Sequence, residues 1–234
     1  MNVSDILQEL QTLGTAGCRR VLMNHGAKEP CHGVKIGDLQ KIRKRTGTDY
    51  QLALDLYDSG IHDARYLAGL IADDARMTEK DLRHWLRNAS RPLAGTTVAG
   101  VAAGSPHGHA LALEWIDSPD GQEAAAGWAT LSGMVSVKSD ADLNILELRA
   151  LLDRVERTIH ASPDDVRYSM NGFIIAAGAA VRELTPAAIE TAERIGVVKV
   201  DMGNTACQVP FAPDYLRKIE ARGTIGKKRK SAKC

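Results

Sequence analysis

The chain has 234 residues, of which 44% are apolar, 25% are charged and only 4% are aromatic. This composition is typical of a soluble globular protein that is long enough to bury a core. No apolar run approaches the roughly 20 residues that span a bilayer, and residues 1–10 lack the pattern of a signal peptide, so we expect a cytoplasmic protein with no membrane contact.

The net charge of +1 hides an uneven distribution of charge along the chain. Residues 227–233, Lys-Lys-Arg-Lys-Ser-Ala-Lys, hold five of the 30 Lys and Arg residues, which leaves 25 basic against 29 acidic residues elsewhere. We therefore expect one domain over residues 1–222 and a basic tail over residues 223–234. The tail is expected to be disordered, with order against the body as the alternative, because residues 224–226 are not of low complexity. The charge of the tail indicates that it binds a polyanion or is solvated.

Helical periodicity runs through nearly the whole chain, and the many small residues favour closely packed helices over a β-sandwich. Thr78, with Asp81 three residues later, predicts a capping box, and Ser4, Ser162 and Thr185 are further expected caps. Only residues 197–201 have strand character, and they have no second run to pair with. The expected helices are residues 2–13, 16–25, 38–46, 49–58, 63–73, 78–89, 93–103, 107–117, 121–137, 142–160, 163–183, 185–195 and 213–222.

The helix over residues 163–183 is expected to be the centre of the fold. Its middle, from Met170 to Val181, carries no charge, and a helix that is apolar all round is buried all round. Gly172 and Gly178 would each cost about 1 kcal/mol against alanine in a helix interior, so we expect a neighbouring helix, or a ligand at Phe173, to approach closely there. Successive helices pair at about 20 to 30 residues per hairpin, which is near the unit size of α-solenoids, although no clean repeat is visible.

Several segments of the sequence resemble the DNA alkylation repair family, the AlkD-like proteins built from HEAT-like repeats. These segments are residues 33–42 (Gly-Val-Lys-Ile-Gly-Asp-Leu-Gln-Lys-Ile), 64–71, 85–86, 168–175, 200–207 and 226–234, so the resemblance covers essentially the whole chain. It implies an all-α, right-handed α-solenoid of HEAT-like helical hairpins, whose concave basic face holds duplex DNA, alkylated or distorted. It also implies a monomer without a cofactor.

The glycosylase members of that family carry a Trp-Asp-x-x-Asp signature, with a carboxylate that acts on the developing sugar cation as an alkylated purine leaves. Here residues 88–94 read Asn-Ala-Ser-Arg-Pro-Leu-Ala, and the family's Trp-x-Arg-Arg element corresponds to Trp128 without the arginines. An oxocarbenium-like transition state needs a nearby anion or base. We therefore assign no catalytic residue and expect DNA binding without the usual chemistry. The enzyme question stays open, because Asp63, Asp74 or Glu123 could make a DNA N-glycosylase with substitute residues.

The candidate nucleic-acid contacts are cations at helical spacing, one aromatic residue of the central helix and the basic tail. A solvated helix face would explain the first group equally well, and a core position would explain the aromatic residue. The candidates are Lys41, Lys44, Arg45, Arg167, Phe173, Lys227, Lys228, Arg229 and Lys230.

Two other functions remain open at this stage. A helical-repeat scaffold could bind a protein partner along its concave face, and its binding would lack the steep salt dependence of phosphate contacts. Cys18, Cys31 and His32, and Cys207 with Cys234, invite a zinc site, but the spacings are irregular and no Cys-x-x-Cys is present, so we expect no metal.

Overall fold

The computed structural model describes residues 2–203 and 205–233, and every regular element in these ranges is helical. The predicted all-α class is confirmed, and helices form at nearly all the expected places. No single helix in these ranges is long and apolar enough to cross a membrane, and one bent pair, Asp164–Ala180 with Arg182–Ile195, passes by length and composition alone. The helices group into two compact units, which are described one at a time.

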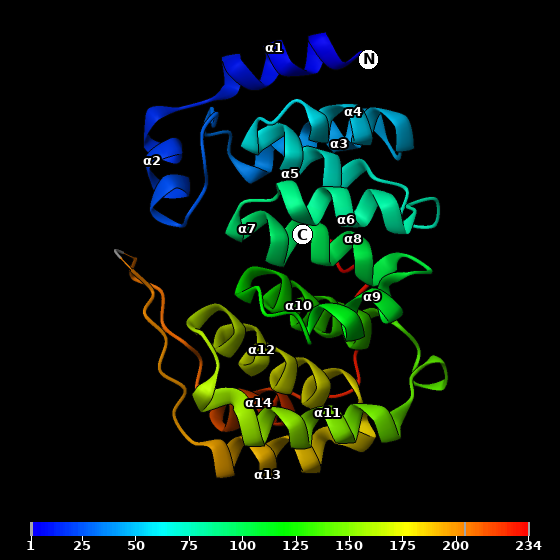
Figure 1. Ribbon diagram of the computed structural model, residues 1–234, viewed down its shortest axis with the longest axis vertical. Helices are drawn as coiled ribbons and strands as arrows, with labels where there is room; N and C mark the ends of the chain where they lie inside the picture. Colours follow the sequence, from blue (N-terminus) through cyan, green and yellow to red (C-terminus); the bar gives the residue numbers. More distant parts are fainter. Residues whose placement is uncertain (1, 204, 234) are drawn as a thin grey trace. The chain divides into compact units, whose positions relative to one another are not determined.

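The first unit contains residues 2–107, joined by Gly203, Thr205 and Lys233 from later in the chain. Helix α5 is its centre, because it packs against α3, α4 and the π-helical turn η1 (Figure 1). The elements of this unit are α1 (Val3–Leu13), α2 (Ala16–Asn24), α3 (Ile36–Thr46), α4 (Tyr50–Asp58), α5 (His62–Ile71), α6 (Glu79–Asn88), α7 (Arg91–Leu93), η1 (Ala94–Val98) and α8 (Ala99–Gly104).

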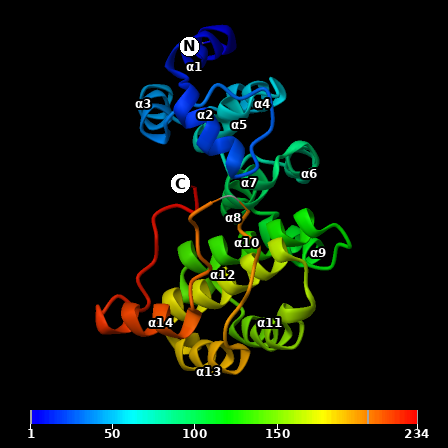
Figure 2. The ribbon, with the colours of Figure 1, turned by 90° about the vertical axis from the view of Figure 1, so that its left-hand side faces the viewer.

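The second unit contains residues 108–202 and 206–232 and is built from three stacked helical hairpins. Helices α10, α12 and α14 lie side by side in one layer, and α11 packs against α13 in the other (Figure 2). The elements of this unit are α9 (Gly108–Trp115), α10 (Gly121–Val137), η2 (Asp140–Asp142), α11 (Ile145–Thr158), η3 (Ile159–Ala161), α12 (Asp164–Ala180), η4 (Arg182–Leu184), α13 (Thr185–Ile195) and α14 (Ala212–Ala221).

Helix α12 is central to the second unit, but it is not buried all round as its sequence suggested. Phe173 and Ile174 are fully buried, whereas Gly172 is exposed. A Cβ atom added at Gly178 would lie 2.7 Å from the Cβ of Ala188 in α13, so the close approach predicted there is confirmed. A Cβ atom at Gly172 would meet nothing within 4 Å, so the same prediction is wrong for Gly172.

One of the four predicted helix caps is confirmed. Thr78 and Asp81 form the expected capping box of α6. The other three expected caps are wrong: Asn2 caps α1, Ser162 Oγ donates to the Thr158 carbonyl oxygen, and Thr185 Oγ1 donates to the Gly178 carbonyl oxygen. Two of these hydroxyls bond to carbonyl oxygens of earlier residues instead of to their own helix.

The connection from α13 to α14 contains the expected extended segment, residues 197–201, and no strand pairs with it within the described residues. Three hydrogen bonds fix this connection to α12. The Arg167 guanidinium donates to the Lys199 carbonyl oxygen at 2.7 Å, the Asp201 amide donates to Asp164 at 2.8 Å, and Asn171 donates to the Pro210 carbonyl oxygen at 3.0 Å. The connection is therefore ordered by side chains and not by a sheet.

Candidate nucleic-acid interface

The basic side chains of α3 lie on the surface of the first unit, as predicted. Lys41 has 77% of its side chain exposed, and its Nζ lies 2.7 Å from Asp38 Oδ1. Arg45 contacts Glu9 of α1 at 2.6 Å, and Lys44 is exposed with no side-chain partner among the described residues. Exposed ion pairs of this kind contribute little to stability, so a phosphate group can replace the carboxylate at small cost.

The loop before α3 is held in place by Asp63, which the sequence had offered as a substitute catalytic acid. The buried carboxylate accepts hydrogen bonds from the backbone amides of His32 and Val34, both at 2.7 Å, and of Gly33 at 3.3 Å. These amides use both of its oxygens. Asp63 therefore anchors the loop that leads to Lys35 and α3, and its lone pairs are not free to meet a sugar.

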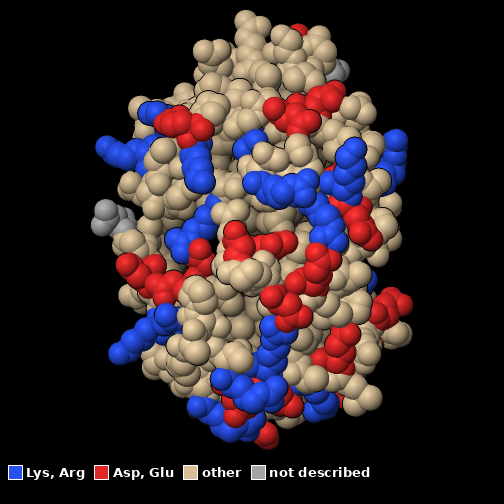
Figure 3. Space-filling model, viewed as in Figure 1, with Lys and Arg blue, Asp and Glu red and all other residues tan. Residues whose placement is uncertain are grey.

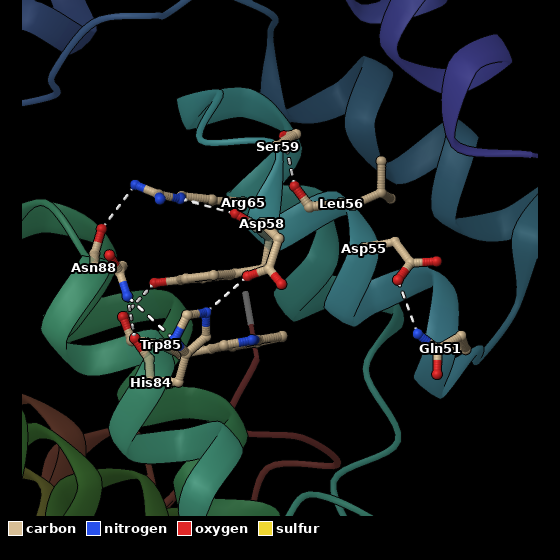
Figure 4. Close-up of polar contacts among 10 residues, drawn as sticks. Gln51, Asp55, Leu56, Asp58, Ser59, Arg65, His84, Trp85 and Asn88 are labelled. Atoms are coloured by element: carbon tan, nitrogen blue, oxygen red, sulfur yellow. Dashed lines mark hydrogen bonds and ion pairs between the residues drawn. The ribbon is translucent and has the colours of Figure 1, made fainter.

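A cluster of polar side chains surrounds the stacked rings of Tyr57 and Trp85, whose centroids are 4.2 Å apart and whose planes differ by 5° (Figure 4). Arg65 lies over the Tyr57 ring at 5.1 Å and donates to the carbonyl oxygens of Tyr57 and Asn88 at 3.0 and 2.7 Å. Tyr57 Oη in turn donates to the Trp85 carbonyl oxygen. These contacts tie the end of α4 to the end of α6.

The same cluster contains an exposed carboxylate and imidazole pair. His84 Nε2 lies 2.7 Å from Asp58 Oδ1, and the Asn88 amide lies 3.3 Å from His84 Nδ1 (Figure 4). Both ring nitrogens of His84 therefore have neighbours within hydrogen-bond distance. Sequence reasoning missed this cluster, because Asp58 meets His84 only when the end of α4 lies beside α6, whereas His84 and Asn88 are neighbours one turn apart on α6.

The region that corresponds to the glycosylase signature is apolar in the structure. Leu93 and Ala94 are each 1% exposed, and they stand where α7 passes into the π-helical turn η1. Neither side chain can accept a proton or stabilise the positive charge that develops on the sugar as a base leaves. The other two candidate acids are engaged elsewhere, because Asp74 contacts Lys233 at 2.9 Å and Glu123 accepts from Ser118 at 2.8 Å.

In the second unit, two predicted contacts have structural roles. Arg167 is bound three times: its guanidinium donates to the carbonyl oxygens of Ser162 and Lys199 and contacts Asp164 at 2.9 Å. Phe173 is fully buried and packs against the Trp128 ring, with centroids 5.3 Å apart. Phe173 therefore has no surface to offer a ligand, and we withdraw it as a nucleic-acid contact.

The basic C-terminal segment, residues 225–230, is ordered against the second unit, so the expectation of a disordered tail is wrong. It completes the C-terminal ends of α10 and α12, whose last carbonyl groups have no partner within the helix. The Gly226 amide donates to the Ala179 carbonyl oxygen at 2.8 Å, and the Arg229 amide donates to the Ser136 carbonyl oxygen at 2.7 Å. Lys228 Nζ contacts both the Val135 carbonyl oxygen and Asp140 at 2.8 Å.

This arrangement divides the tail cations into two groups. The Lys228 ammonium is used within the second unit, where a cation near a helix C-terminus also complements the helix dipole. Lys233, only 13% exposed, contacts the Ala72 carbonyl oxygen and Asp74 within the first unit. Lys227, Arg229 and Lys230 are exposed, and the ammonium groups of Lys227 and Lys230 can meet a phosphate.

Charge is intermixed on the face drawn in Figure 3, where Lys and Arg side chains alternate with Asp and Glu side chains. No single-sign patch dominates this face. Contacts to an anionic backbone would therefore come from individual cations placed between acids.

The cysteines and histidines do not gather into a metal site in the part of the chain that the structure describes. Burial raises the pKa of the Cys31 thiol to about 11, which disfavours the thiolate that zinc requires. Cys18, Cys31 and Cys207 form no disulfide among the described residues, and Cys234 lies outside them.

Comparison with known proteins gives consistent results over the whole chain. The family model described as "DNA alkylation repair enzyme" matches residues 6–207. Uncharacterized protein Lin0241 of Listeria innocua and uncharacterized protein Lmo0209 of Listeria monocytogenes are each 32% identical over 220 residues, covering 92% of this chain and 95% of theirs.

A solved structure matches with a TM-score of 0.92 and 31% identity, covering 100% of both chains. It represents a new family of proteins related to the HEAT-like repeat DNA glycosylases, with affinity for branched DNA structures. The predicted all-α fold of HEAT-like helical hairpins is confirmed by this match.

Proposed function

Because the chain belongs to the DNA alkylation repair enzyme family, we propose that it binds DNA, holding duplex or branched DNA through its phosphates without the family's glycosylase chemistry. The observation that carries the proposal is the full-length match to a structure whose protein has affinity for branched DNA. The exposed cations of α3 and of the C-terminal segment supply a physical means of binding.

The form of the contacts follows from the side chains. Lys44, Lys227 and Lys230 are exposed, and Lys41 and Arg45 are held only by surface carboxylates. Cations on flexible stems suit a phosphate backbone and carry no sequence information. We infer affinity that depends on the shape and charge of the DNA, and not on its base sequence.

The binding test uses fluorescence anisotropy with a labelled four-way junction and a labelled linear duplex of equal length, over a range of salt concentrations. Affinity should fall steeply with salt, with each phosphate contact adding about 0.9 to the slope of log K against log salt. The triple variant Lys41→Ala, Lys44→Ala, Arg45→Ala should bind more weakly and with a shallower slope. Arg194→Gln is the matched control, because Arg194 is an exposed arginine already bound to Glu156 through two nitrogens.

A salt-independent interaction, or no binding to either DNA, would contradict the proposal and favour a protein-binding scaffold.

The absence of glycosylase chemistry is tested separately, with duplex DNA that contains methylated purines. Buried Leu93 and Ala94 predict base release at the spontaneous rate. Release well above that rate would show that another group replaces the missing carboxylate.

A further inference from the structure

Helix α14 carries an exposed stripe of two aromatic residues followed by two cations. Phe211, Tyr215, Lys218 and Arg222 stand at positions i, i+4, i+7 and i+11, which share one face of an α-helix. Phe211 is 42% exposed and Tyr215 is 48% exposed, and both cations are exposed as well. Figure 2 shows α14 at the edge of the second unit, next to α12 and α13.

The packing of α14 does not explain this stripe. Its core side is formed by Ala212, Pro213 and Leu216, which are buried, and Leu216 reaches the position of Gly178 in α12. Removing Phe211 and Tyr215 from water would be favourable, yet the fold leaves nearly half of each ring exposed.

The charges on α14 are also separated by face. Arg217, which lies outside the stripe, contacts Glu193 of α13 and lies 3.6 Å from Asp214. These two acids therefore have a cationic partner that is not part of the stripe. Within the described residues, the side chains of Lys218 and Arg222 have no hydrogen-bond or ion-pair partner. The stripe therefore combines half-exposed aromatic side chains with cations that have no hydrogen-bond or ion-pair partner among the described residues.

We propose that this stripe of α14 binds unpaired nucleotides of DNA, with bases stacked on Phe211 and Tyr215 and phosphates held by Lys218 and Arg222. Aromatic platforms beside cations are the combination that holds single strands without reading their sequence. From Phe211 to Arg222 the chain advances eleven residues, about 16 Å at the rise of a helix, which is enough for roughly four or five stacked nucleotides. This site is argued from α14 alone and goes beyond the phosphate contacts to paired DNA proposed above.

The experiment measures binding of a labelled 12-nucleotide oligo-dT and of a labelled 12-base-pair duplex to the full chain by fluorescence anisotropy. The double variant Phe211→Ala, Tyr215→Ala should lose about tenfold or more in affinity for oligo-dT, because stacking contributes strongly for each base. Its affinity for the duplex should change by less than about twofold. Lys218→Ala with Arg222→Ala should weaken oligo-dT binding and reduce its salt dependence by about 1.4 in slope, from two single-strand phosphate contacts.

Leu146→Ala on α11 is the matched control, because Leu146 is also a large exposed apolar side chain but lies outside the stripe. Since Phe211 is the N-cap residue of α14, Tyr215→Ser alone replaces the double variant if the latter loses helical circular dichroism. Oligo-dT binding that is absent in the natural chain, or unchanged in the aromatic variants, would overturn the proposal. Duplex binding that persists in that case would leave the function proposed above intact.

Two other occupants of the stripe would be detected in the same series. Sedimentation velocity that shows a dimer of the natural chain and a monomer of the aromatic variant would assign the stripe to a second copy. Flotation with anionic vesicles that requires Phe211 and Tyr215 would assign it to a lipid surface. Either result, with unchanged oligo-dT binding, would refute the nucleotide site.

Discussion

Replacing Gly178 by alanine places a methyl group where α12, α13 and α14 converge. The new Cβ atom would lie 2.7 Å from the Cβ of Ala188 and 2.9 Å from a terminal methyl of Leu216. Leu216 can rotate away, but the Cβ of Ala188 is fixed to the backbone of α13, so the two helices must separate. Overpacking of this kind costs about 1–3 kcal/mol, and the better helix propensity of alanine returns at most about 1 kcal/mol. We expect Gly178→Ala to lower the free energy of unfolding by about 1–2 kcal/mol.

Gly172→Ala is the control within the same helix, because a Cβ atom there meets nothing within 4 Å. This exposed position should gain about 0.5–1 kcal/mol from propensity alone. Urea unfolding followed by far-UV circular dichroism separates the two variants, which should differ by about 2 kcal/mol in opposite directions. A Gly178→Ala variant as stable as Gly172→Ala would show that the three helices do not touch at this point.

Three further variants test other contacts. Asp63→Ala should cost about 3–5 kcal/mol in urea unfolding, because three backbone amides lose a buried charged acceptor, whereas exposed Asp55→Ala should change stability by less than about 0.5 kcal/mol. Thr78→Ala should cost about 1–2 kcal/mol by removing the capping box of α6, and Thr78→Ser should restore most of it. Burial lowers the pKa of His62 below its ordinary value near 6.5, so the unfolded chain binds a proton that the folded chain rejects. Stability should therefore fall as pH drops below about 6.5, and His62→Gln should flatten that slope, whereas an unchanged slope would exclude His62 as its source.

Local features of the fold could be predicted from the sequence because their partners lie within one helical turn. The bounds of α10 and the Thr78–Asp81 box of α6 depend only on neighbouring residues. Thr185 was predicted wrongly because its hydroxyl binds Gly178, seven residues earlier, across a bend. A side chain that can cap its own helix can equally bind another carbonyl group, and only the tertiary structure decides between them.

The candidate site was harder to predict than the fold. The missing glycosylase carboxylate could be inferred from residues 88–94, and the structure places apolar Leu93 and Ala94 in the core there. The burial of Phe173 was the alternative reading of an aromatic residue in an apolar helix, and the structure favours it. The bond from Arg167 to the Lys199 carbonyl oxygen could not be inferred, because it depends on a segment 32 residues later in the chain. The stripe on α14 was not recognised in the sequence, because the expected helix over residues 213–222 begins after Phe211, and the exposure of its side chains required the structure.

The contacts between residues 226–229 and the ends of α10 and α12 have a consequence for synthesis of the protein. The carbonyl group of Val135 receives its ammonium donor from a residue 93 positions later in the chain. During translation, α10 and α12 leave the ribosome long before Gly226, Lys228 and Arg229 are made, and water must hydrate those carbonyl groups in the meantime. The second unit can therefore reach its final bonding only after residue 229 has left the ribosome.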